Sequence, residues 1–89
     1  MRAVITVIGK DKVGILAKVS SVCAAHNVSV SEVSQTIMQD IFCMMMMCDI
    51  SDISIDFGDF ADKMTALGQE MGLSIHAMHE DIFNSMHRI

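Results

Sequence analysis

The segment Ile41–Ile50, with the sequence IFCMMMMCDI, is apolar on both faces of the strand that it would form. Successive side chains of a strand point to opposite faces of the sheet. A strand that is apolar on both sides belongs in the middle of a sheet whose two faces are covered. One face would carry Phe42, Met44, Met46, Cys48 and Ile50, and the other Ile41, Cys43, Met45 and Met47.

The length and composition favour one compact domain, and we expect it to span residues 1–89. Hydrophobic residues make up 52% of the chain and charged residues 19%, which argues against disorder. With ten Met, four Phe and no Trp or Tyr, the core should consist of soft, unbranched side chains. The longest apolar stretch, Ile41–Cys48, is far too short to span a bilayer.

The charge distribution disfavours nucleic acid as a partner. The formal net charge of −5 comes from six Lys and Arg against eleven Asp and Glu. The six positive residues are scattered and form no stripe, whereas phosphate contacts supply most of the affinity of nucleic-acid binding.

The three cysteines cannot all pair within one chain, because their number is odd. Cys43 and Cys48 are five positions apart on one expected strand, so they face opposite sides and cannot hold a metal together. We interpret all three as reduced, buried cysteines. Reduced cysteines are typical of a cytoplasmic protein, which is the location that we expect.

The hydrophobic period switches along the chain between the strand value of two and the helical value of 3.6, and each switch marks a new element. A slip of the alternation around Ser31–Val33 indicates a bulge, and Gln39-Asp40 is a plausible hairpin turn. Strands are predicted at Arg2–Ile8, Val28–Met38, Ile41–Ile50 and Leu73–His79, and helices at Gly14–Asn27 and Phe57–Met71, followed by a short helix capped by Asp81.

This order is that of an α+β, ferredoxin-like βαββαβ fold, with a four-stranded antiparallel sheet and a short C-terminal helix in an extension at about 81–89. Right-handed crossovers place the first and third strands in the middle of the sheet. Both long helices then cover one face, and the other face has no cover within the chain. We expect a homodimer, because that face and the Ser-rich second strand would otherwise be exposed.

The stretch GKDKVGIL, residues 9–16, connects the first strand to the first helix. Its glycine spacing mimics a phosphate-binding loop, but Ile15 and Leu16 stand where Lys and Ser or Thr are required. The unpaired N–H groups of a helix start attract a carboxylate as readily as a phosphate. Asp11 offers an acceptor for an ammonium group, so the loop would suit a free amino acid.

GKDKVGIL after a first strand, with His26-Asn27-Val28 ending the first helix, resembles the ACT domain. The tail HEDIFNSMHRI is similar to the ending of a family of short standalone ACT proteins of unassigned function. The resemblance implies a regulatory module that binds an amino acid at a dimer interface. This sequence departs from the family in having Val13 where Pro is frequent and in lacking an attached enzyme domain. The residues that match the binding region are Asp11, Val13, Gly14, Ile15, Leu16 and Asn27.

Plainer roles stay open for several of these residues. Asp11 could simply cap the first helix, Gly14 could serve close packing, and Asn27 could only end the helix. A metal site is conceivable only if His79, Glu80, Asp81 and His87 converge, and their spacing is loose.

We expect no enzymatic activity and no cofactor, because the sequence shows no recognisable Ser–His–Asp or Cys–His arrangement. The predicted function is a non-enzymatic sensor for a small amino acid or related metabolite. The alternative is a ligand-free module, resembling glycine-cleavage-repressor-type ACT proteins, whose dimer surface recruits a protein partner. No membrane partner is expected.

Overall fold

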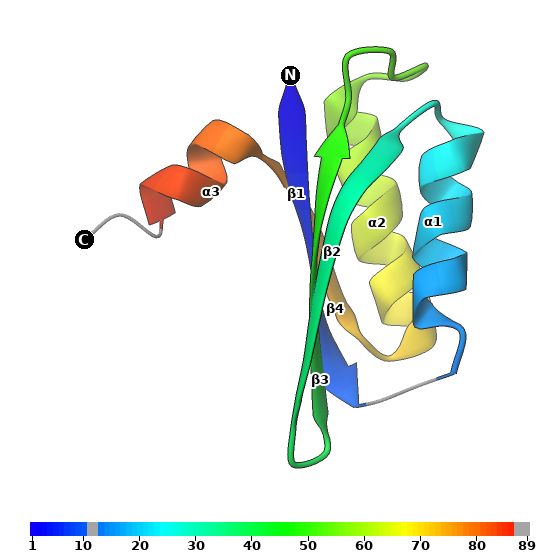
Figure 1. Cartoon of the computed structure of the whole chain (residues 1–89). Helices are drawn as coiled ribbons and strands as arrows, with labels where there is room; N and C mark the ends of the chain where they lie inside the picture. The colour runs from blue at the N-terminus through cyan, green and yellow to red at the C-terminus, as the bar shows by residue number, and fades with distance from the viewer. Residues whose placement is uncertain (11–12, 87–89) are drawn as a thin grey trace.

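The computed structural model describes residues 1–10 and 13–86, and the elements within them follow the predicted order (Figure 1). They are β1 (Arg2–Lys10), α1 (Ile15–Ala25), β2 (Ser29–Met38), β3 (Ile41–Asp49), α2 (Phe57–Met71), β4 (Ser74–His79) and α3 (Glu80–Met86).

The four strands form one antiparallel sheet in the order β2-β3-β1-β4. The ferredoxin-like fold and the central position of the first and third strands are therefore confirmed. β3, which is apolar on both faces, pairs along its length with β1 on one side and with β2 on the other. Two-sided pairing satisfies its backbone, and the apolar residues of one face reach the core.

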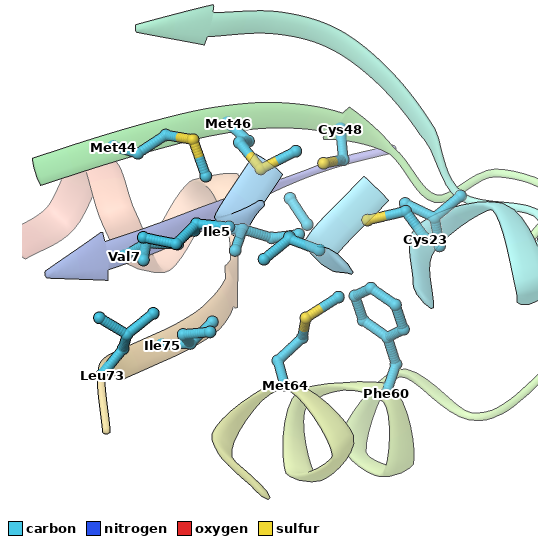
Figure 2. Packing of buried hydrophobic residues seen from close by; sticks show 14 of the residues in the cluster. Ile5, Val7, Cys23, Met44, Met46, Cys48, Phe60, Met64, Leu73 and Ile75 are labelled. Carbon is cyan, nitrogen blue, oxygen red and sulfur yellow. The ribbon is translucent and has the colours of Figure 1, made fainter. Parts of the chain in front are cut away.

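Helices α1 and α2 lie side by side on one face of the sheet and close the core (Figure 1). Sulfur-containing side chains occupy much of this core, as the composition predicts, and Figure 2 shows them between β3 and the helices. The core side chains that are less than 2% exposed include Ile5, Val7, Val19, Cys23, Met44, Met46, Cys48, Phe60, Met64 and Ile75.

The opposite face of the sheet is not bare, which corrects one expectation. Helix α3 lies on that side, where β4 ends (Figure 1). Phe83 of α3 lines a cavity of about 140 Å³ together with Val4 and Met47. Val4 points away from α1 and α2, yet it is only 2% exposed. The chain thus covers one end of this face and leaves Ile8, at the other end, 51% exposed.

Three local signals in the sequence are confirmed, two at helix ends and one inside β2. Asn27 adopts a φ of 60° two residues after the end of α1, and Gly72 ends α2 with a φ of 72°. Both lie in the left-handed region that helix ends often need. The register of β2 against β3 shifts between Val30 and Glu32, which is the expected bulge.

Most element boundaries lie within one or two residues of the predicted ones, and two of the differences change the interpretation of a residue. β1 extends through Gly9 and Lys10, which pair with Phe42 and Ile41, so Gly9 belongs to the strand and not to the loop. Asp81 is not a cap, because α3 begins at Glu80 and both acidic residues lie in its first turn. In this first turn the two carboxylates interact favourably with the helix dipole.

Helix α2 packs through a narrower stripe than its apolar spacing suggests. Phe60 and Met64 are fully buried, whereas Phe57, Leu67 and Met71 are only partly buried at the edges. The third fully packed position is Gly68, which the sequence interpretation did not single out. Its place eight residues after Phe60 continues the spacing of the buried stripe.

No helix among the described residues has the length and apolar character needed to cross a membrane.

Candidate ligand-binding loop

The first turn of α1 begins directly after Gly14, which has a φ of 84°. Only glycine adopts this left-handed conformation without strain, so the glycine sets the direction in which the chain enters the helix. No side chain among the described residues caps this helix start, and its first turn carries no acidic residue. The N–H groups of that turn therefore have no side-chain partner within the described chain.

The remaining predicted loop residues differ in what they expose. Val13 is fully exposed and Leu16 is 39% exposed, whereas Ile15 is 2% exposed with its side chain in the core. Ile15 could therefore contact a ligand only through its backbone. Asp11 lies outside the described residues.

Asn27 lies at the other end of the same helix. The eleven residues of α1 and then His26 separate it from Gly14, and the helix alone is roughly 16 Å long at 1.5 Å per residue. The structure thus brings Val13, Gly14, Ile15 and Leu16 together but does not bring Asn27 to them within one chain. A site containing both ends of α1 would need a second chain.

Two lysines of the described chain flank the loop, although the sequence analysis treated the positive charges as scattered. Lys10 ends β1, and Lys18 lies one turn into α1, where its N–H bonds the carbonyl oxygen of Gly14 at 3.0 Å. Both side chains are exposed. Although the chain is acidic overall, residues 10–18 contain three of its six Lys and Arg. This local concentration was visible in the sequence.

The end of the sheet opposite the loop carries a different cluster. Arg2 donates from Nε to Glu80 Oε2 at 2.8 Å, and the second oxygen of Glu80 accepts from Nη2. These residues border an open cavity of about 670 Å³ together with Met1, His79, Asp81 and Ile82. The glutamate raises the pKa of the guanidinium, first through the hydrogen bond and then through its charge. Since the pair is already matched in charge, the cavity offers little free charge to a ligand.

The structure tests only part of the predicted metal site that would include His79, Glu80, Asp81 and His87. His79 stacks on Phe57 with ring centroids 4.2 Å apart, whereas the His76 ring lies 3.0 Å from Ser74 Oγ. The two rings thus have separate partners. Among the described residues no group of three or more His, Cys, Asp and Glu is placed to hold a metal. His87 lies outside them.

The strand order and the helix that begins after Gly14 define a small ferredoxin-like α+β domain, and sequence comparison identifies its family. The model of the ACT domain matches residues 2–78. The chain therefore belongs to the ACT domain family. It is also 52% identical over its whole length to a UPF0237 protein of Listeria innocua, which it covers completely.

Solved structures agree with this assignment. An ACT domain protein from Streptococcus pneumoniae superimposes with a TM-score of 0.80 at 37% identity, and the match covers 93% of each chain. A chain described as a glycine cleavage system transcriptional repressor matches with a TM-score of 0.70 over 85% of this chain and 43% of its own. At 19% identity, the second likeness shows the fold alone. The resemblance to standalone ACT proteins is thus confirmed, whereas the likeness to the repressor extends to the fold.

Proposed function

We propose that this protein is a non-enzymatic regulatory module that binds a small amino acid or related metabolite at a homodimer interface. The observation that carries the proposal is the start of α1 after Gly14, which no side chain of residues 1–10 and 13–86 caps. The N–H groups of this first turn suit a carboxylate, and the nearby Lys10 and Lys18 add positive charge. The amino group of the ligand would bind Asp11, or Asn27 of a second chain.

The surfaces left open by the fold support a homodimer. Every residue of β2 is exposed, and its outer edge has no neighbouring strand among the described residues. On the sheet face opposite α1 and α2, an apolar patch formed by Ile8, Met38, Ile41 and Met45 remains uncovered, and each of these side chains is more than 40% exposed. Two-fold association is the usual way to close such surfaces.

Two measurements test the proposal. A thermal-shift screen against the twenty amino acids and common cofactors identifies a ligand, and calorimetry then compares the parent with Asp11→Ala and Gly14→Asn. Loss of one charge-assisted contact costs about 1.5–3 kcal/mol, so Asp11→Ala should weaken binding roughly tenfold to a hundredfold. Gly14→Asn keeps the left-handed backbone and adds a side chain at the loop, so it should also weaken binding.

Light scattering at micromolar concentration checks the dimer, and a monomer would contradict a ligand site shared between chains. If the protein is a dimer but binds no amino acid, the alternative of a ligand-free interaction module takes over. The same uncovered patch supports that alternative.

A further inference from the structure

Two thiols face each other inside the core, a relationship that sequence spacing does not show. Cys23 lies on α1 and Cys48 on β3, and Figure 2 shows both sulfur atoms in the space between these two elements. Both side chains are completely buried, both cysteines are free, and the Cys48 thiol acts on the pKa of Cys23 as a hydrogen-bond donor. The third cysteine, Cys43, is only partly buried, which corrects the expectation that all three are buried. Cys43 points to the opposite face of β3 and cannot join the other two.

The backbones that carry the two thiols are held firmly. The Cys23 carbonyl accepts hydrogen bonds from the N–H groups of His26 and Val28, at 3.1 and 2.8 Å. Cys48 is paired with Ala3 on one side and with Val30 on the other. The two sulfur atoms are therefore held in the same part of the core, and a disulfide between them would join α1 to β3.

The hydrogen bond also makes the two thiols chemically unequal. Donation from the Cys48 S–H lowers the pKa of Cys23, although burial opposes this effect. The same bond raises the pKa of Cys48, and burial raises it further. A proton therefore leaves Cys23 first, and the thiolate is the reactive form of cysteine.

We propose that Cys23 and Cys48 are a redox modification site, at which a hydroperoxide converts the facing thiols into an intramolecular disulfide. The Cys23 thiolate attacks one peroxide oxygen and the O–O bond breaks. The leaving oxygen takes up the proton that Cys23 released, and it departs as water from hydrogen peroxide or as an alcohol from an organic hydroperoxide, which leaves a sulfenic acid on Cys23. The Cys48 sulfur then attacks the Cys23 sulfur, the S–O bond breaks, and the departing hydroxide takes the Cys48 proton and leaves as water. Both sulfurs are oxidised and the hydroperoxide is reduced.

Access to the pair lies along the β2 edge of the sheet. Val30, the partner of Cys48 in this edge strand, is 36% exposed, so only one strand separates the thiols from solvent. Local opening of an edge strand is easier than global unfolding, and hydrogen peroxide is small enough to use it. The resulting bond would tie α1 to the central strand β3.

The experiment uses the Cys43→Ser variant, which leaves only the two facing thiols, and hydrogen peroxide as the oxidant under native conditions. We expect loss of both titratable thiols, a mass decrease of two hydrogen atoms, and a linked peptide containing Cys23 and Cys48. Dithiothreitol should reverse all three changes. The cross-link restricts the unfolded chain, so the melting temperature of the oxidised protein should rise by roughly 10 °C.

The matched control carries Cys48→Ala in the Cys43→Ser background. It should instead retain an oxidised Cys23 with added oxygen and form no intramolecular disulfide. The proposal would be overturned if both thiols survived peroxide in the folded protein, or if they became linked only after denaturant was added. It would also be overturned if Cys23 gained oxygen without linkage although Cys48 was present. The fourth contradicting result is a melting temperature that is unchanged or lower after oxidation. If the control does not fold, peptide mapping of the peroxide-treated parent protein still shows whether Cys23 and Cys48 become linked.

Discussion

Gly68 of α2 packs against the backbone around Ile75 so closely that a β-carbon at position 68 would lie 2.9 Å from the Ile75 amide nitrogen. The carbonyl oxygen of Leu73 would be equally near. Both neighbours are backbone atoms of the segment that includes β4, so neither can move aside as a flexible side chain would. The absence of a side chain at this one position sets how closely the second helix approaches the edge strand.

The first prediction follows from this contact. Gly68→Ala should destabilise the fold by about 1–2 kcal/mol, because the steric cost of overpacking exceeds the gain in helix propensity. Gln69→Ala, at an exposed position of the same helix, is the matched control and should be close to neutral. Urea unfolding followed by circular dichroism measures both variants. A Gly68→Ala variant more stable than the parent would show that the helix can shift away from β4.

The second prediction concerns the entry to α1. A β-carbon at Gly14 would meet no atom within 4 Å, so the glycine is required by its φ of 84° and not by lack of space. Gly14→Ala should therefore cost about 1–2 kcal/mol of stability, the penalty of the left-handed conformation. Gly14→Asn should cost less, because Asn tolerates that conformation. Equal unfolding midpoints for the two variants would contradict a backbone role.

The third prediction concerns the buried stripe of α2. Phe60 is completely buried and contacts the rings of Phe57 and His26, with centroids 6.1 and 6.2 Å away. Phe60→Ala should cost about 3–5 kcal/mol. Phe60→Asp should abolish folding, because an unpaired buried charge costs more than a small domain can offset. Asp62→Ala, exposed on the same helix, serves as the control. Cooperative unfolding of a soluble Phe60→Asp variant would refute this packing.

The fourth prediction concerns the turn after β3. The side-chain hydroxyl and then the backbone N–H of Ser51 donate to Asp49 Oδ1, at 2.6 and 2.9 Å, and hold the pKa of Asp49 below its ordinary value of 3.8. A lowered folded-state pKa adds stability that is present above the unfolded pKa and lost as the pH falls through the folded one. Ser51→Ala should raise the Asp49 pKa toward 3.8 and so reduce the stability that the protein loses as the pH falls. Carboxyl NMR titration of both proteins tests this, and an unchanged pKa in the variant would show that Ser51 does not set it.

Much of the fold could be predicted from local pattern. The two-sided apolar run of β3 required a central strand, and the helical spacing of α2 required a packed face. Asn27 and Gly72 marked helix ends because few other residues adopt a positive φ. These features depend on neighbouring residues of the chain, and the sequence contains that information directly.

The tertiary structure alone decided which distant residues meet. The sequence around Gly68 does not indicate what this residue contacts, because the backbone that it touches lies in another element. The same holds for Cys23 and Cys48, which become neighbours only when α1 packs across β3. Helix α3 has too few residues for its apolar pattern to reveal which side of the sheet it would cover. Periodicity determines which face of an element is buried, but the partner on that face depends on how the chain crosses over, which no local pattern encodes.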